Sequence, residues 1–476
     1  MRERPRRRDF ARDSLQILGG QVVMTGLGLV NGVISARWLG PTARGQFQLL
    51  MLLPIVLSNF VKLGIPQASV YYMRRRGASA SDVASNSIWV AVVMGGGAVA
   101  VCWLWRDTLL EKFLKQTPPG LLLPSLALIP FVLLQFYLLG VAQAEERFRE
   151  YNVRQVVPPV LALIGLTITL VLLRMGLAGA VIVQVAIQVF MTLWMTWRVH
   201  RESPLRLAWN GRLARGMLGF GSKSYVQTLA QTLHFRIDQF LCAYFLTPAD
   251  VGLYAIAVNF ATLLLRIPEA SGTVMYPRLA GSSERDAHAA TTRVCRHTLL
   301  VLGLGVIAFA IAGPILIPLV YGRRYNGAVR PFLILLPGLL VMGLYNLLTR
   351  NFTSRGRQET NIVAACVALA LNVGLNLSLI PRYGIAGAAV ANGLSYGTAA
   401  FILLAAFVNA SGHSVRETLL VRREEIRELA RTARRLATRW QDGRPEPGPG
   451  SEAKATAGRG GTSQRGAGAR AAGEAE

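Results

Sequence analysis

The sequence is poor in charged residues and poorest in acidic ones. Only 16% of its 476 residues are charged, against about 25% in an ordinary soluble domain, and 52% are hydrophobic. The 25 acidic residues face 51 lysines and arginines, which gives a formal net charge of +26. A nucleic-acid-binding protein with this charge would need a polar surface, but the mean hydropathy of +0.39 leaves little of one. The composition argues against a cytosolic enzyme and a nucleic-acid partner, and it favours a multi-spanning membrane protein.

Cysteine is scarce as well. The four cysteines lie far apart and follow no CxxC or histidine spacing; they are Cys102, Cys242, Cys295 and Cys366. Neither a zinc site nor a disulfide framework is predicted, and the thiols are expected to be buried or to face lipid. The sequence also has no nucleotide-binding glycine-rich loop, which disfavours an ATP-driven pump. We therefore expect no metal ion and no cofactor.

Long apolar runs dominate the chain up to residue 409. A helix needs about 20 mostly apolar residues to cross a membrane, and twelve such runs are bounded by arginine, glycine or proline clusters. The arginine-rich residues 1–14 precede a run too long for a signal peptide, so the first span is expected to stay attached. The predicted fold class is an all-α integral membrane protein with twelve transmembrane helices. They are placed at 15–38, 46–71, 84–105, 121–143, 155–174, 177–197, 216–246, 251–272, 297–321, 331–349, 360–380 and 386–409.

Lysine and arginine are distributed unevenly among the predicted loops. With the N-terminus placed in the cytoplasm, the N-terminal segment and the inner loops hold 25 basic residues, whereas the outer loops hold 10. Basic residues are retained on the cytoplasmic side of membrane proteins. We therefore predict a multi-pass protein of the cytoplasmic (inner) membrane, with both termini in the cytoplasm.

Composition divides the chain into six segments. In residues 413–440 apolar side chains recur at helical spacing among arginines, which is typical of a helix lying on anionic lipid. A solvated basic coiled coil is the alternative. The segments are a basic cytoplasmic N-terminus (1–14), an N-terminal six-helix bundle (15–200), a cytoplasmic linker (201–215), a C-terminal six-helix bundle (216–409), an amphipathic cytoplasmic helix (413–440) and a disordered tail (441–476).

The two halves of the chain share a sequence pattern. At an offset of 207 residues, five positions of the first half match five of the second. Two unrelated proline–glycine turns are the alternative explanation, but five spaced matches favour homology. Since both matched segments follow spans that leave the cytoplasm, the repeat is parallel, which predicts two pseudo-symmetric bundles with a shared cavity between them. The matches place Ala36, Leu39, Pro41, Gly45 and Phe47 over Ala243, Leu246, Pro248, Gly252 and Tyr254.

Four segments resemble a known family. They are ARWLGPTARGQF (36–47), RIDQFLCAYFLTPADVGLYAIA (236–257), YPRLAG (276–281) and NVGLNLSLIPRYGIAGAAVA (372–391). Their order and spacing resemble the polysaccharide transporter branch, which includes flippases of O-antigen and other lipid-linked oligosaccharides, of the multidrug/oligosaccharidyl-lipid/polysaccharide exporter superfamily. The resemblance covers residues 14–409. It implies two six-helix bundles around a central cavity and the flipping of undecaprenyl-diphosphate-linked oligosaccharide to the outer leaflet. The chain lacks the thirteenth and fourteenth spans that some members carry.

Few ionisable residues fall within the predicted spans. Each is a candidate functional residue, because placing a charge inside a membrane is costly. In the seventh span a set of polar residues recurs at intervals of three and four, which places them on one face of a continuous helix. Such a polar stripe cannot face lipid, so we expect it to line water, the other bundle or a substrate path. The stripe consists of Lys223, Gln227, Gln231, His234 and Asp238.

Basic residues outnumber acids inside the predicted spans. A net-positive cavity suits a lipid-linked diphosphate, which arginine and lysine bind by charge-assisted hydrogen bonds, while amides suit the glycan. For Arg236 and Lys62 the alternative is that the side chain reaches the membrane interface. The predicted substrate-binding residues are Lys62, Lys223, Gln227, Gln231 and Arg236.

The ionisable side chains Asp238 and Glu269 of the spans each have a neighbour that could explain them. Asp238 and His234 are predicted to carry a coupling proton or cation. The alternative is that Asp238 neutralises a neighbouring base. Arg266 and Glu269 are three residues apart on one helix, and we expect an ordinary local ion pair between them.

Together these patterns predict a flippase that moves a lipid-diphosphate-linked oligosaccharide from the inner to the outer leaflet by alternating access, for cell-surface polysaccharide biosynthesis. A cation-coupled drug antiporter of the same superfamily is the main alternative, but it would need an acid-rich cavity. A membrane enzyme acting on lipid-linked sugar is less favoured, because the longest outer loop, 106–120, offers only Asp107 and Glu111 as acids. The expected partners are the lipid-linked oligosaccharide, membrane lipids and polysaccharide-assembly proteins.

Overall fold

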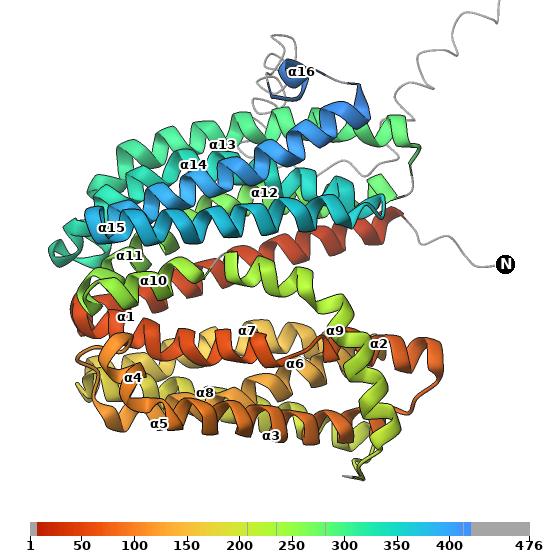
Figure 1. The fold of residues 1–476 in the computed structure, drawn as a ribbon, viewed down its shortest axis with the longest axis vertical. Helices are drawn as coiled ribbons and strands as arrows, with labels where there is room; N and C mark the ends of the chain where they lie inside the picture. Colours follow the sequence, from red (N-terminus) through yellow and green to blue (C-terminus); the bar gives the residue numbers. More distant parts are fainter. Residues whose placement is uncertain (1–6, 207, 235, 281, 413, 420–476) are drawn as a thin grey trace, which may run out of the picture. The chain divides into compact units, whose positions relative to one another are not determined.

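The structure is a computed structural model that describes residues 7–419 apart from 207, 235, 281 and 413 (Figure 1). Every regular element in this part of the chain is a helix. The α-helices are α1 (Arg7–Val61), α2 (Ile65–Arg76), α3 (Ala80–Leu104), α4 (Arg106–Lys112), α5 (Leu122–Leu126), α6 (Leu128–Ala144), α7 (Phe148–Leu166), α8 (Gly176–Glu202), α9 (Gly211–His234), α10 (Ile237–Phe245), α11 (Pro248–Ala261), α12 (Arg266–Ala280), α13 (Glu284–Tyr321), α14 (Val329–Ser354), α15 (Gln358–Ser411) and α16 (Val415–Leu419). Short 3₁₀ or π segments are η1 (Pro119–Leu121), η2 (Thr167–Leu172), η3 (Thr262–Leu265) and η4 (Arg323–Ala328).

The helices have the length and composition of membrane spans. Nine helical segments of the described residues are long and apolar enough to cross a bilayer. Two of these segments, in α1 and α15, are interrupted by a glycine with a positive φ angle, 72° at Gly40 and 58° at Gly384. Such angles favour glycine and break the helical path, so α1 and α15 are each two helices joined at a kink. The all-α membrane fold is confirmed, and the total of twelve crossings stays a prediction.

The helices pack in two groups that follow the order of the sequence. In the first half α6 contacts α2, α3 and α8, and in the second half α14 contacts α12, α13 and α15. Figure 1 shows the first group in orange and yellow and the second in green and blue. Helix α1 contacts α7 and α8 of the first group and α11 of the second, so it lies at the boundary between them. Residues 413 and 420–476, which include most of the predicted amphipathic helix and all of the tail, lie outside the described part.

The repeated proline–glycine positions meet at this boundary. A Cβ atom on Gly45 would overlap the carbonyl oxygen of Pro248, and one on Gly252 would overlap that of Pro41. The first proline–glycine pair therefore packs against its counterpart in the second half, and the contact is reciprocal. Only glycine allows the two backbones to approach this closely.

The chain turns at two ends of the helical groups. The Gly40 end, as we call it, contains Gly40, the α10–α11 turn and Gly322; here Lys115 Nζ donates to the carbonyl of Tyr244 at 2.6 Å and to that of Leu246 at 3.2 Å. The opposite end, the Gly77 end, contains the turn between α2 and α3 and the loops at 145–147, 282–283 and 355–357.

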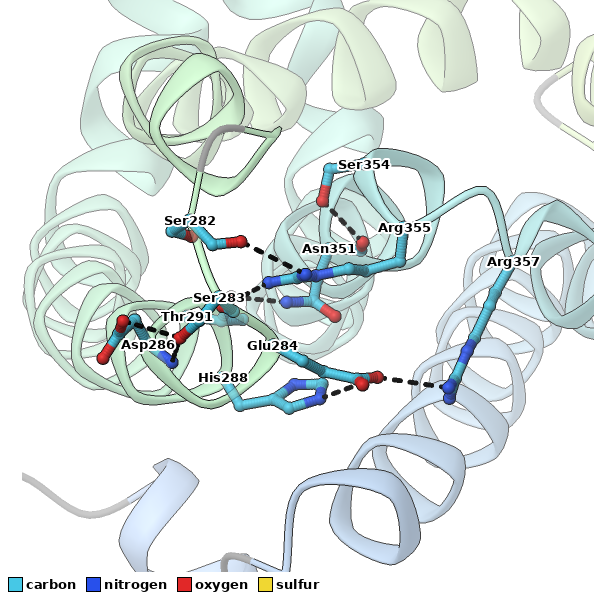
Figure 2. Close-up of polar contacts among 10 residues, drawn as sticks. All are labelled: Ser282, Ser283, Glu284, Asp286, His288, Thr291, Asn351, Ser354, Arg355 and Arg357. Carbon is cyan, nitrogen blue, oxygen red and sulfur yellow. Dashed lines mark hydrogen bonds and ion pairs between the residues drawn. The ribbon is translucent and has the colours of Figure 1, made fainter.

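Arginines of the Gly77 end are held by neighbouring loops (Figure 2). Arg355 Nη2 donates to the carbonyl of Ser283 at 2.8 Å, and Arg357 pairs with Glu284 at 3.1 Å. In the first half Arg147 similarly pairs with Glu202 at 2.9 Å. These loop charges therefore connect helix ends.

Candidate functional site

A cavity of about 660 Å³ lies between the two helical groups. Its walls come from α1, α7 and α8 of the first half and from α11, α12 and α13 of the second. A cavity lined by both halves is the place where a parallel repeat puts a transported substrate. We call it the central cavity.

Three arginines line the central cavity: Arg44, Arg154 and Arg266. No carboxylate is among the described residues that line it, and its polar lining otherwise consists of amides and hydroxyls. Glu269 lies beside the cavity and pairs with Arg266 at 2.9 Å, which confirms the predicted local ion pair. The charge of the lining is therefore positive, as predicted for this space, although the residues that carry it differ from those predicted.

Arg44 is the most deeply buried of the three arginines. Pro41 begins the helix directly after the kink at Gly40, and Arg44 lies in the first turn of that helix. Its side chain is 7% exposed, and within the described part of the chain its Nε has no hydrogen-bond partner. Its guanidinium carbon lies 5.5 Å from the centre of the Phe47 ring. A buried guanidinium with an unused donor beside a cavity is suited to an anionic ligand.

Arg154 and Lys62 both contact the ring of Phe136. The Arg154 guanidinium carbon is 5.2 Å and Lys62 Nζ is 4.3 Å from the ring centre. Lys62 is 7% exposed, donates to Asn59 Oδ1 at 3.0 Å and does not line the central cavity. Its Nζ also lies 5.4 Å from the ring centre of Tyr225 in α9, so Lys62 lies where the first helical group meets α9, outside the central cavity.

The predicted polar stripe is corrected, because its helix is broken. Arg236, with φ −131° and ψ −17°, lies outside the helical region, so α9 ends at His234 and α10 begins at Ile237. Asp238 therefore does not continue the helical face of α9. Four stripe residues belong to α9, but their side chains lie outside the described part: Lys223, Gln227, Gln231 and His234.

Arg236 lines a different cavity. This space of about 440 Å³ lies among α1, α9, α10 and α15, and its other lining side chains are apolar apart from the hydroxyl of Tyr244. Arg236 is exposed, and it does not line the central cavity. The structure thus separates Arg236 from the arginines of the central cavity.

Asp238 lies in a packed polar cluster of the second half and is 2% exposed. Tyr254 Oη and Asn392 Nδ2 each donate to Asp238 Oδ2 at 2.7 Å, and the Gln239 backbone N–H donates to Oδ1 at 2.8 Å. Among the described residues the carboxylate contacts neutral donors and pairs with no basic side chain. Three hydrogen bonds stabilise a buried carboxylate without a counter-ion.

Further amides extend this cluster along α15. Asn372 Nδ2 donates to Asn392 Oδ1 at 2.8 Å, and Asn376 Nδ2 donates to Asn372 Oδ1 at 2.9 Å. The Asn376 Oδ1 atom is buried and accepts no hydrogen bond within the described part. We call Asp238, Tyr254, Asn392, Asn372 and Asn376 the Asp238 cluster.

Arg44 and Arg154 were not among the predicted site residues because both fall between predicted spans, whereas Arg266 was predicted within a span but only as a partner of Glu269. The helix after Gly40 begins at Pro41, five residues before the predicted span, and so includes Arg44. Arg44 also lies in the repeated segment 36–47, next to the glycine that contacts the second half. The position of Arg44 in the repeated segment was therefore the signal in the sequence that could have marked it as a residue of the shared cavity. No comparable signal marks Arg154, whose role depends on how α7 packs.

Comparisons with known proteins agree with this architecture. Residues 34–330, more than half of the chain, match the family described as polysaccharide biosynthesis protein. A probable low-salt glycan biosynthesis flippase, Agl15 of Haloferax volcanii, is 22% identical over 213 residues, which are 43% of this chain. The chain covers 44% of that relative's length.

Two solved structures share the fold. The lipid II flippase MurJ in an inward closed conformation matches with a TM-score of 0.72 and 14% identity, covering 82% of this chain and 89% of that one. An inward-facing multidrug resistance MATE family transporter of the MOP superfamily matches with a TM-score of 0.67 and 16% identity, covering 82% and 96%. The chain therefore belongs to the polysaccharide biosynthesis protein family.

Proposed function

We propose that this protein flips a lipid-diphosphate-linked oligosaccharide from the inner to the outer leaflet of the cytoplasmic membrane, and that it is a transporter and not an enzyme. The observation that carries the proposal is the central cavity, where three arginines and no described carboxylate meet between the two halves. A diphosphate concentrates negative charge that arginines bind by paired, charge-assisted hydrogen bonds.

The alternative substrates fit this lining less well. Arg44 and Arg154 would repel a cationic drug by their positive charge. No described carboxylate of the lining would attract such a drug. An enzyme acting on the sugar would need a positioned base or acid beside the substrate. The amides of Asn31, Gln184 and Asn259 in the lining suit the hydroxyl groups of a glycan.

Coupling to an ion gradient is proposed for the Asp238 cluster. A buried carboxylate among neutral amides offers hard oxygen donors for a small cation, and it can also bind a proton. The free acceptor of Asn376 supports the cation. We propose this role for Asp238 with His234, as predicted from the sequence. Lys62, Lys223, Gln227, Gln231 and Arg236 are proposed as secondary contacts of the substrate during the conformational cycle.

The proposed orientation places the Gly40 end outside and both termini in the cytoplasm, where polysaccharide-assembly proteins would meet the chain. Single cysteines at Glu111 and Asn326 of the Gly40 end, in a Cys366→Ser background, should react with an impermeant thiol reagent in intact cells. Cysteines at Arg76 and Arg285 should react only after permeabilisation. All four positions are exposed, so accessibility within the protein is matched. The reverse labelling pattern would reject this orientation.

The experiment that tests the function is a flipping assay with purified protein in liposomes that contain a polyprenyl-diphosphate-linked oligosaccharide. Arg44→Gln and Arg266→Gln each remove one charge-assisted contact, worth about 1.5–3 kcal/mol, so flipping at limiting substrate should fall roughly tenfold or more. Arg330→Gln and Arg382→Gln remove exposed arginines outside the cavity and serve as controls. Normal flipping by well-folded Arg44→Gln and Arg266→Gln proteins would disprove the proposal.

A further inference from the structure

A second basic cavity opens at the Gly40 end. Its volume is about 770 Å³, and it lies between the last turn of α1 before Gly40, the end of α13 and η4. Arg37, Arg323 and Arg324 line it, and no carboxylate is among its described lining residues. The loops predicted to face outward hold few basic residues, yet three of them surround this one space. We call it the outer arginine pocket.

Arg37 is held in a fixed position. Its Nε donates to the carbonyl of Val320 at 2.7 Å, and its Nη2 donates to the carbonyl of Leu319 at 2.6 Å. These carbonyls belong to the last turn of α13, where a cation is favourable and the backbone has no helical partner. Arginine has five N–H donors, so the guanidinium keeps donors for a ligand. Capping of α13 explains Arg37 but leaves the other two arginines unexplained.

Arg323 and Arg324 carry the further charge. Both are exposed, and neither pairs with an acid within the described part of the chain. Arg324 Nη1 would lie 3.8 Å from a Cβ atom on Gly40, so its guanidinium extends over the kink of α1. This contrasts with the arginines of the Gly77 end, where Arg357 pairs with Glu284. Three cations without an acid favour a ligand that carries more than one negative charge.

The apolar side of the pocket indicates a lipid. Ile315 and Leu319 of α13 line it and are 66% and 65% exposed, as expected of side chains that face hydrocarbon. Trp38, next to Arg37, is 48% exposed, and tryptophan is enriched where membrane meets water. A ligand here can therefore place an acyl or prenyl chain along α13 and an anionic group among the arginines.

One side chain connects this pocket to the central cavity. Tyr321 lines both spaces and is itself buried. Beside it, Tyr325 Oη donates to the carbonyl of Ala36 at 2.9 Å, which ties η4 to α1. Tyr321, whose ring centre is 6.2 Å from that of Tyr325, is thus the described side chain that the two cavities share.

We propose that the outer arginine pocket binds the diphosphate of a polyprenyl-linked lipid, and that it receives this group as it leaves the central cavity past Tyr321. The binding site stands on its own observations, whereas the role as a receiving site rests on the proposed function. Arg37, Arg323 and Arg324 would hold the diphosphate in this pocket as Arg44 would hold it in the central cavity.

The test uses the full chain in phosphatidylcholine nanodiscs, with undecaprenyl diphosphate as the probe and native mass spectrometry as the count of bound lipids. The wild type should bind two molecules. The double variant Arg323→Gln/Arg324→Gln should bind one, with the affinity of the lost site at least about tenfold lower, and Arg323→Lys/Arg324→Lys should restore much of it. Arg330→Gln/Arg382→Gln is the matched control and should bind two.

The outcomes separate the two proposals. If Arg44→Gln/Arg266→Gln leaves the count unchanged but Arg323→Gln/Arg324→Gln reduces it, the outer pocket stands and the proposed function fails. If the outer double variant, folded with an unchanged melting temperature, binds both lipids as tightly as the control, the inference is wrong. It is also wrong if inorganic diphosphate or phosphatidylglycerol displaces the outer lipid at equal concentration, since the site would then serve free anions or bulk lipid.

Discussion

The central cavity and the Asp238 cluster treat buried charge in opposite ways. Arg44 lies beside a hollow and keeps an Nε donor that no described group accepts. Asp238 lies in a packed interior and accepts hydrogen bonds from Tyr254, Asn392 and a backbone N–H. Arg44 keeps a hydrogen-bond donor for a ligand, whereas the protein's own donors satisfy the carboxylate of Asp238.

This difference separates binding from stability. Removing the carboxylate of Asp238 leaves three buried donors without an acceptor, which costs stability. Removing the guanidinium of Arg44 relieves the cost of burying a charge that lacks a full set of partners in the ligand-free protein. The cavity should therefore respond to mutation in transport, and the cluster should respond in both transport and stability.

The largest effect is expected at Asp238. Asp238→Ala removes the acceptor of three buried donors and should lower the free energy of unfolding by about 2–4 kcal/mol, seen as a lower melting temperature of the purified protein. Asp238→Asn keeps one acceptor oxygen and should retain more stability while losing the dependence of flipping on an ion gradient. Asp107→Ala, at an exposed acid, is the control and should melt normally. If the Asp238→Ala protein is as stable as the control, the Asp238 cluster does not stabilise the fold and does not differ from the central cavity in this respect.

At Arg44 the expected effect is on transport alone. Arg44→Gln should reduce flipping roughly tenfold and leave the melting temperature unchanged or higher, because it removes a buried cation whose Nε has no hydrogen-bond partner among the described residues. Measuring both quantities on one preparation sharpens the comparison. Strong destabilisation without loss of flipping would show that Arg44 is structural.

Smaller effects are expected at the cations outside the cavity. Lys62→Gln removes a hydrogen bond to Asn59 and a contact with Phe136, so a loss of about 1 kcal/mol in stability is expected with a change in flipping below about threefold. Arg236→Gln should behave similarly in flipping, because Arg236 faces an apolar space. If either variant reduces flipping as strongly as Arg44→Gln, that residue is a main contact of the substrate and not a secondary one.

The smallest effect is expected at the C-terminus. Deleting 441–476 should change neither flipping nor melting temperature, because a tail rich in glycine, alanine, proline and charge contributes no apolar core. The measurement is the same flipping assay at matched protein levels. A complete loss of glycan export would give the tail a function that neither region above explains.

Local patterns predicted the membrane fold, the repeat and the family. Hydropathy over a span depends on neighbouring residues alone, and the spacing of Pro41 and Gly45 is visible in the chain itself. The inclusion of Asp238 in the stripe of the seventh span was wrong for a local reason that the sequence hides. Nothing in the residue types at 234–238 announces that Arg236 leaves the helical region, because arginine is a good helix former.

The sequence by itself determined that this protein spans a membrane and that its halves are related, because these properties follow from composition and spacing. The tertiary structure decided which charges line the cavity, because the arginines there are not the basic residues from which a positive cavity was predicted. Arg44 falls in a predicted loop, but in the structure it lies in the helix that begins after the kink at Gly40. The side chains that donate to Asp238 belong to α11 and α15 and lie up to 154 positions away in the sequence. Long-range packing brings such residues together, and no local pattern encodes it.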